Sequence, residues 1–247
     1  MKELAIGEIK KIIIIFEINN NNLIHTTMPN HISNILSVSA KTAGEIQNFL
    51  NAIKGENTMD SEQQVIDFNA IIPMPMDLRN TESSSYIDDA IYYYLAKNNL
   101  VEYNRQKMDR LQKSNKELNE LYKIGEKYVG YEKEYGAKDW YDWSRQNWGT
   151  KWNAYDSNIN IISDSSVEIR FLTAWNGVPE LISKLTEMYP ELTFEYKFAD
   201  EDMGYNTGEG YTDADGFTFY YNDNGSDEAM ATFAQCWGYD FDEDDEE

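Results

Sequence analysis

The chain has 247 residues, of which 41% are hydrophobic and 14% aromatic, so it suits one large folded domain, or a domain with an insertion, rather than a disordered chain. Its 44 acidic and 21 basic side chains give a formal net charge of −23, which excludes binding of nucleic acid through a broad basic face. The single cysteine and the two histidines exclude an internal disulfide and a Cys- or His-rich metal centre.

Residues 1–27 are predicted to be an N-terminal extension. A short apolar run in them, 12–16, is followed by a run of asparagines, and Met28 opens a better domain start. The apolar run is far shorter than the roughly 20 residues that span a membrane. It does not indicate a signal peptide either. We therefore expect a cytoplasmic protein that does not bind a membrane.

Residues 28–82 are predicted to form the first part of an α+β core. The segment 32–39 alternates with the period of a half-buried strand. A helix is expected after Thr42, because Thr42 and Glu45 have the spacing of a capping box. A second apolar stretch, 65–72, ends at prolines that cannot extend a strand ladder.

Residues 83–137 are predicted to be a helical insertion, because no proline interrupts them and side chains recur with a heptad period. Asn98 and Asn99 are expected to form a corner between a first helix and a longer one. Two arrangements stay open: an antiparallel hairpin that packs on itself, or a coiled coil that binds a second copy or a partner. The contact residues of this helical arm would be Val101, Met108, Leu111, Leu118 and Tyr122.

Residues 138–239 are predicted to complete the core and to include an acidic lobe. The expected elements are a helix over 139–148, a helix from Pro179, a last helix capped by Ser226, and strands over 167–175, 192–198 and 217–221. Strands that alternate with helices, two of them predicted to pair in antiparallel fashion, favour an α+β fold. The closing run 240–247 is predicted to be a mobile acidic tail.

Three sets of motifs resemble the YubB-type ferredoxin-like domain family. The first is Met28-Pro29-Asn30-His31 with Asn34. The second is Asp67-Phe68-Asn69 running into Ile71-Ile72-Pro73-Met74-Pro75. The third is the most specific: it joins Trp140-Tyr141-Asp142-Trp143 and the run from Asn147 to Asp156 to Thr173-Ala174-Trp175, Ala199-Asp200-Glu201-Asp202, Gly204 and Asn206.

This resemblance implies a fold and a genetic setting. Members of the family have a split β-α-β ferredoxin-like core and occur on plasmids, phages and integrated elements. The resemblance implies no catalytic mechanism, so no active-site residue carries over. The predicted architecture is an antiparallel ferredoxin-like sheet core with a long helical insertion and an acidic C-terminal lobe.

The negative charge is concentrated near the C-terminus, because residues 198–247 hold 16 acids and neither Lys nor Arg. Before the tail these acids are interleaved with aromatic residues, so a folded acidic face is expected. Closely spaced carboxylates can imitate the phosphates of a duplex and attract a basic nucleic-acid-binding groove. The predicted partner-binding residues are Asp200, Glu201, Asp202, Glu209, Asp213, Asp215, Asp223, Asp227 and Glu228.

The leading hypothesis is a non-enzymatic inhibitor carried by a phage or related element. It would act in the cytoplasm of the host bacterium by occupying the basic channel of a defence complex, such as a CRISPR effector or a restriction enzyme. The expected partner is a basic nucleic-acid-binding protein; no direct contact with nucleic acid, no cofactor and no catalytic residue are predicted.

Other readings stay open beside this hypothesis. The acidic surface can serve solubility alone. The helical insertion can make the protein a scaffold or a homodimer. The carboxylates between 200 and 215 can serve a metal-dependent enzyme, although they lack the glycine spacing of a calcium-binding EF-hand loop, and a solvated acidic loop is expected there instead.

The remaining candidates are interpreted as structural. His31 is expected to be a hydrogen-bonded structural histidine and Cys236 a buried small apolar group, because neither has a partner in the sequence for nucleophilic catalysis. Four tryptophans that lie close together in the sequence more often anchor a core than stack on bases or sugars. They are Trp140, Trp143, Trp148 and Trp152.

Overall fold

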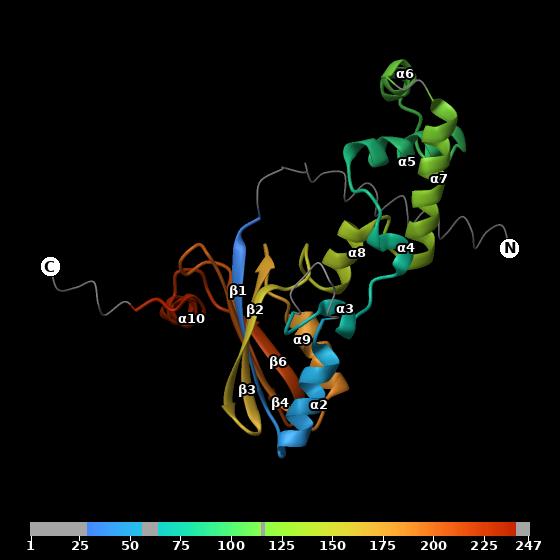
Figure 1. Ribbon diagram of the computed structural model, residues 1–247. Helices are drawn as coiled ribbons and strands as arrows, with labels where there is room; N and C mark the ends of the chain where they lie inside the picture. Colours follow the sequence, from blue (N-terminus) through green and yellow to red (C-terminus); the bar gives the residue numbers. More distant parts are fainter. Residues whose placement is uncertain (1–28, 56–63, 115–116, 241–247) are drawn as a thin grey trace. The chain divides into compact units, whose positions relative to one another are not determined.

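The computed structural model describes residues 29–55, 64–114 and 117–240, which divide into two compact units (Figure 1). Within the described part, the first unit comprises residues 74–143 and the second the remainder. The predicted N-terminal extension, and the acidic tail beyond Asp240, lie outside the described residues. None of the described helices combines the length and the apolar composition needed to cross a bilayer.

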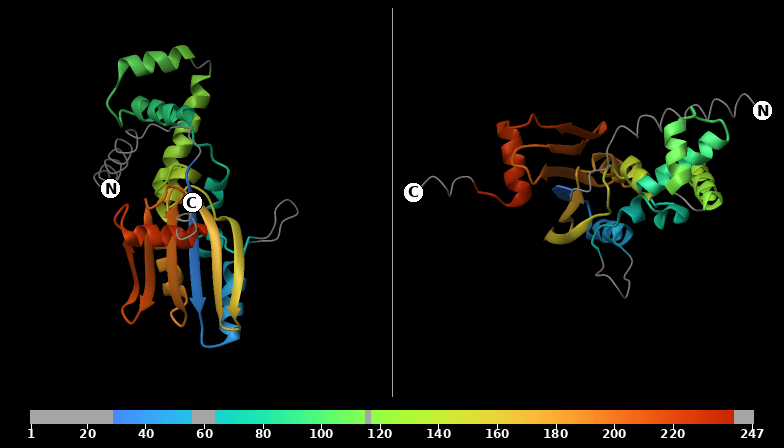
Figure 2. Two further views of the ribbon diagram at one scale, coloured as in Figure 1. Left: turned by 90° about the vertical axis from the view of Figure 1, so that its left-hand side faces the viewer. Right: turned by 90° about the horizontal axis from the view of Figure 1, so that it is seen from above.

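The second unit is built on an antiparallel sheet of six strands in the order β2-β3-β1-β4-β5-β6 (Figure 2). Its first four strands with α2 and α9 form the βαββαβ arrangement of a ferredoxin-like fold, and the β5–β6 hairpin extends the sheet beyond β4. The strands are β1 (His31–Ser39), β2 (Tyr155–Ser163), β3 (Ser166–Ala174), β4 (Thr193–Asp200), β5 (Thr207–Asp213) and β6 (Gly216–Tyr221).

Helices lie on both faces of this sheet (Figure 1). On one face are α2 (Ala43–Ile53), the short α3 (Phe68–Ile71) and α9 (Pro179–Met188); on the other is α10 (Asp227–Trp237). Three local signals act as the sequence predicts: Thr42 and Glu45 form a capping box, Pro179 occupies the first turn of α9, and Ser226 caps α10. The apolar stretch at 65–72 forms only the single turn α3.

The central strand β1 is buried on both of its faces, which corrects the prediction of a half-buried strand. Ile35 packs with Phe233 and Cys236 of α10 in one apolar cluster. The Ser33 hydroxyl donates a 2.7 Å hydrogen bond to the carbonyl of Cys236. The helix that completes this second layer is distant in sequence, so the alternation within β1 does not reveal it.

Two strands, β2 and β5, were not predicted. The polar, glycine-containing sequence of β5 lacks the apolar alternation of a strand, and its packing explains why. A Cβ atom at Gly208 would lie 2.6 Å from the ring of Phe219 and 3.0 Å from that of Phe198. These two rings stack with their centroids 6.0 Å apart. The glycine leaves the space in which aromatic side chains of β4 and β6 meet, so β5 is stabilised by its neighbours.

The first unit is helical, and its core lies where α5, α6 and α7 meet. Ala90 and Tyr93 of α5 are buried there together with Leu121 of α7. The helices are α4 (Met76–Arg79), α5 (Ser85–Lys97), α6 (Arg105–Ser114), α7 (Leu118–Tyr135) and α8 (Trp140–Asn147), and α8 continues into the second unit.

The heptad row does not form one long coiled-coil helix, which corrects that prediction. Val101 lies in the non-helical link between α5 and α6, and Asn115 lies outside the described residues. Met108 and Leu111 are each 1% exposed and pack in the core of the first unit. The other residues of the predicted helical-arm contact, which are partly buried against the same cluster, are Val101, Leu118 and Tyr122.

The predicted corner after α5 is present. The helix ends at Lys97, and Asn99 adopts a left-handed conformation with φ 56°. Tyr94 of α5 packs against Tyr122 near the start of α7, whereas the backbone N–H of Glu82, before α5, donates to the hydroxyl of Tyr128 further along α7. The two helices are therefore antiparallel, and the heptad side chains are used within the chain.

Candidate functional site

The candidate site lies at the end of the sheet where β1 begins, which we call the entry end. The pairing of His31 with Ala174 and of Ile32 with Asp200 places the ends of β3 and β4 there. β5 begins and β6 ends at the same end. The opposite end carries the β2–β3 and β5–β6 turns.

The predicted acidic residues do not form one continuous face. Glu209 lies within β5, whereas Asp213 and Asp215 lie at the β5–β6 turn. With a rise of roughly 3.4 Å per residue, this turn is about 20 Å from the entry end. The structure brings the others together at the entry end, at the last residue of β4, on the loops after β4 and β6 and at the start of α10: Asp200, Glu201, Asp202, Asp223, Asp227 and Glu228.

Asp200 is an internal hydrogen-bond acceptor and not a contact residue, because it is only 6% exposed. Its Oδ1 accepts from the Asn30 side chain at 3.0 Å and from the Asp202 backbone at 3.1 Å. Its Oδ2 accepts from Asn206 at 3.2 Å, and Asn206 also donates to the carbonyl of Trp175. Asp200 therefore holds in place the segments around it, which corrects its predicted role in partner binding.

The acidic loops after β4 and β6 are hydrogen-bonded to each other. The backbone N–H of Gly225 donates to the carbonyl of Gly204 at 2.8 Å, and that of Asn206 donates to Asn224 Oδ1 at 3.2 Å. Hydrogen bonds from its own backbone N–H and from Ser226 lower the pKa of Glu228, so this carboxylate is charged at neutral pH. The exposed carboxylates on these loops and on the first turn of α10 are Glu201, Asp202, Asp223, Asp227 and Glu228.

Glu209 belongs to a different environment, on the sheet face that α10 partly covers. Its carboxylate lies 3.3 Å from Lys197 Nζ and accepts from the Tyr220 hydroxyl at 3.2 Å. Arg170 and Glu168 form a second pair at 2.8 Å on the same face. These ion pairs balance the charge of the sheet face, so Glu209 does not extend the acidic surface of the entry end.

The carboxylates named for a metal-dependent enzyme do not share one site, because they are divided between the two ends of the sheet. Among the described residues, no group of three His, Cys, Asp or Glu side chains is placed to hold a metal ion.

The predicted tryptophan core is correct in part. Trp143 and Trp148 are 5% and 4% exposed, and the Trp148 indole N–H donates to the carbonyl of Ile72 at 2.9 Å. Trp140 is half-buried. Trp152 is 39% exposed, which corrects its assignment to the core.

Cys236 and His31 have the structural environments expected of them, with one difference. Burial raises the pKa of the Cys236 thiol to about 12, as suits a small apolar group in a core. His31 Nδ1 lies 2.7 Å from the Tyr155 hydroxyl, but its side chain is exposed at the entry end. The histidine is therefore hydrogen-bonded without being buried.

Sequence reasoning missed how the motifs behind the family resemblance meet. Asn30, Trp175, Asp200 and Asn206 come from separate motifs, and hydrogen bonds join them at the entry end. The available signal was the presence of polar Asn and Asp residues, and of Trp175, within the motifs themselves. Their spacing along the chain gave no indication of proximity, because strand pairing decides which motifs become neighbours.

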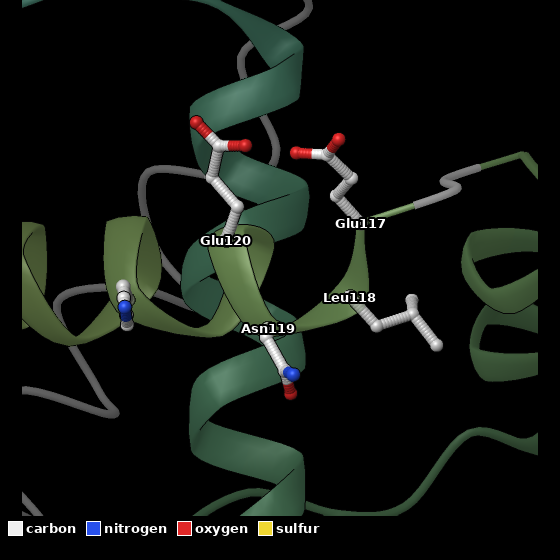
Figure 3. A pocket seen from close by; sticks show the side chains of 5 residues that line it. Glu117, Leu118, Asn119 and Glu120 are labelled. Atoms are coloured by element: carbon white, nitrogen blue, oxygen red, sulfur yellow. The ribbon is translucent and has the colours of Figure 1, made fainter.

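The first unit has an open surface concavity at the start of α7 (Figure 3). The carboxyl groups of Glu117 and Glu120 face each other there, and a hydrogen bond between them raises the pKa of Glu117. The lining residues are Glu117, Leu118, Asn119, Glu120 and Lys123. None of them belongs to the acidic surface of the second unit.

Sheet order and helix placement define the class of the second unit as a ferredoxin-like domain. Residues 147–244 match the family model described as the ferredoxin-like domain in Api92-like protein. The predicted ferredoxin-like fold is therefore confirmed, whereas the YubB-type assignment stays a prediction.

A crystal structure of a protein api92 from Yersinia pseudotuberculosis also matches the chain. The match has 11% sequence identity and a TM-score of 0.41, and it covers 80% of this chain and 99% of that one. None of the curated proteins matches the chain.

Proposed function

We propose that this protein is a non-enzymatic inhibitor from a phage or related mobile element that acts in the bacterial cytoplasm. Its partner is a basic nucleic-acid-binding protein of a host defence system, such as a CRISPR effector or a restriction enzyme, whose nucleic-acid channel it covers. The mobile-element setting rests on the resemblance to the YubB-type family. The proposal depends on one observation: exposed carboxylates gather at the entry end on loops that are hydrogen-bonded to each other.

Electrostatics supports this proposal. The second unit, residues 28–73 and 144–247, holds 28 acids and 7 bases, a net charge of −21. A surface of one sign attracts a groove of the opposite sign at long range and accelerates association. Salt screens such attraction, with a Debye length of about 8 Å at physiological ionic strength. Binding is therefore expected to be fast and salt-sensitive.

The acidic surface also has two properties of a protein interface. Its loops are held by hydrogen bonds, so little conformational entropy is lost when a partner binds. The loop after β4 exposes Met203 and Tyr205, with 42% and 57% of their surfaces accessible. Methionine and tyrosine are enriched at interfaces, and tyrosine is among the residues that dominate binding energy.

A charge-reversal experiment tests the proposal. The variant Glu201→Lys, Asp223→Lys, Asp227→Lys should lose inhibition of nucleic-acid binding by the susceptible member of a panel of purified CRISPR effectors and restriction enzymes. The control Asp164→Lys, Glu191→Lys, Asp215→Lys makes the same charge change at the opposite end of the sheet and should retain inhibition.

Salt provides a second readout, because affinity should fall by at least about tenfold between 50 and 300 mM salt. Inhibition that survives reversal at the entry end would contradict the proposal, as would the absence of inhibition across the panel. The scaffold alternative gains no support from Met108 and Leu111, since both would have to leave the core of the first unit to reach a partner.

A further inference from the structure

We propose that the entry end contains a recognition site for an arginine side chain of the partner. The indole of Trp152 provides a face on which the guanidinium stacks, and the carboxylates of Asp156 and Glu201 provide its counter-charges. This inference rests on the proposed function, because the arginine belongs to the basic partner. It goes further by naming the side-chain chemistry that the site recognises.

Trp152 lies in an aromatic group that already accepts a cation of the chain itself. The Lys151 ammonium is 4.7 Å from the ring centroid of Trp152 and 4.8 Å from that of Trp175. The Tyr155 ring lies edge-on to Trp152, with centroids 6.3 Å apart. With 39% of its surface accessible, Trp152 can take a further ligand. Arginine suits such a ring better than lysine, because its planar guanidinium stacks and is more weakly hydrated.

The residues that carry the two carboxylates adjoin this aromatic group, because Asp156 follows Tyr155 in the chain and Glu201 is hydrogen-bonded to His31. The backbone N–H of Glu201 donates to the carbonyl of His31 at 3.0 Å, and the His31 ring contacts the Tyr155 hydroxyl. Burial, together with the negative charges of Asp156 and Glu201, raises the pKa of Tyr155 to about 12. Both carboxylates therefore act on the same phenol, and both are exposed.

The backbone of this region is held in unusual conformations. Asp156, Trp175 and Asn206 have φ values of 48°, 72° and 45°. For a residue as bulky as tryptophan a positive φ is a genuine outlier, and such strain collects at binding sites where the surrounding structure enforces it. Here the Trp175 backbone is held on both sides, because its N–H donates to Asn30 and its carbonyl accepts from Asn206.

An anionic ligand with a flat ring, such as a nucleotide, would use the same indole and would pair with Lys151 instead. Asp156 and Glu201 disfavour it by like-charge repulsion. The two ligand classes predict opposite effects for Lys151→Met, which removes the positive charge and keeps most of the side chain's bulk. Affinity for an arginine ligand should stay the same or rise, whereas affinity for an anion should fall.

The test uses the full-length chain and three probes: an arginine-rich dodecapeptide, the same peptide with lysine in place of arginine, and a single-stranded oligonucleotide. We expect calorimetry to show tighter binding of the arginine peptide than of the lysine peptide. Trp152→Leu should lower affinity for the arginine peptide about fivefold and for the lysine peptide less. Unchanged melting temperature and circular dichroism would show that this variant is folded.

A matched pair of double variants separates the site from bulk charge. Asp156→Asn with Glu201→Gln should weaken binding of the arginine peptide about tenfold, and asparagine tolerates the positive φ of position 156. Asp213→Asn with Asp215→Asn removes the same charge at the opposite end and should have little effect. Equal losses in both pairs, or equal affinity for the two peptides, would overturn the arginine site while leaving the proposed function intact.

Two other outcomes are equally decisive. Oligonucleotide binding that Lys151→Met abolishes would assign the site to an anionic ligand and overturn the inference. The protein could also bind arginine selectively through Trp152 and yet inhibit no member of the defence panel. That result would support the arginine site and contradict the proposed function.

Discussion

The two units use their charged side chains in different ways. Residues 74–143 hold 13 acids and 11 bases, a net charge of −2, against −21 for the second unit. In the first unit, Asp88 lies 2.7 Å from Lys138 and Asp89 lies 3.3 Å from Lys107. Charge there is largely balanced by ion pairs within the unit, and it serves the packing of the unit itself.

The second unit pairs charges on its sheet face but collects unbalanced ones at the entry end. Glu209 meets Lys197 on the sheet, whereas neither Lys nor Arg follows Lys197 in the chain. Of the net charge of −23, −21 therefore belongs to the second unit. An external function for the charge is therefore expected of the second unit alone.

The largest expected effect is a loss of stability in the first unit, with no change in the second. A Cβ atom at Gly125 of α7 would lie 2.1 Å from the carbonyl oxygen of Ala90 in α5. Gly125→Ala must therefore push the two helices apart. We expect the free energy of unfolding of the first unit to fall by about 3 kcal/mol. Hydrogen exchange should speed up in α5 and α7 and stay unchanged in β1.

Gly130 supplies the control for that prediction. It lies in the same helix, and a Cβ atom there would have no neighbouring heavy atom within 4 Å. Gly130→Ala should stabilise the unit by up to about 1 kcal/mol, because alanine favours the helix. Destabilisation of similar size by both substitutions would contradict close packing as the explanation of the Gly125 result, because a methyl group at position 130 has space.

The second-largest expected effect is a loss of stability in the second unit. The fully buried Tyr196 hydroxyl donates to Asn34 Oδ1 at 2.6 Å and accepts from the Val178 backbone at 2.7 Å. Tyr196→Phe leaves both groups without this partner in the core, so we expect a loss of about 2 kcal/mol. Exchange should accelerate in the sheet only. Tyr205→Phe, at an exposed tyrosine, should change nothing, and an equal loss there would refute the explanation.

A pH dependence should appear chiefly in the first unit. Burial, aided by the charge of Asp142 and opposed by Lys138, raises the pKa of Glu132 to about 7; burial and Asp142 also raise that of Asp139 to about 6. Carboxyl groups in the unfolded chain have pKa values of about 4. Because the folded pKa values are the higher ones, this stabilisation is complete below the unfolded values and is lost as the pH rises through 6 to 7.

The measurement is hydrogen exchange, corrected for its intrinsic pH dependence, between pH 5 and 8. The first unit should lose about 1–2 kcal/mol over this range, and Glu132→Gln should remove much of the dependence. Glu126→Gln, at an exposed position of α7, should leave it in place. A first unit that gains stability as the pH rises would contradict the assignment.

The smallest expected effect tests the difference in net charge between the two units. Raising the salt concentration from about 20 to 500 mM screens the repulsion among the acids of the second unit. We expect this unit to gain up to about 1 kcal/mol, and the nearly neutral first unit to gain less. The gains are measured by hydrogen exchange in the two units of the same sample. Equal gains would contradict the expectation that uncompensated negative charge destabilises the second unit more than the first.

Local signals in the sequence predicted local structure well. The capping box at Thr42, the proline at the start of α9 and the Ser226 cap each depend on residues within four positions, so the chain shows them directly. Alternation likewise predicted β1, β3 and β4, and the aromatic run 217–221 predicted β6. The charge segregation was also evident, because it is a count along the chain.

Tertiary structure alone decided what each of these elements contacts. A heptad period reports that a helix has an apolar face, but Met108 and Leu111 turn that face toward α5 of the same chain rather than toward a second copy. In the sequence Gly208 indicates a break in a strand. In the fold it leaves the space that the rings of Phe198 and Phe219 occupy. Strand pairing separated Asp213 from Asp200, buried Asp200, and left Trp152 exposed. The sequence by itself determined the elements and the amount of charge, because these depend on neighbours along the chain; burial and proximity depend on partners far away in it.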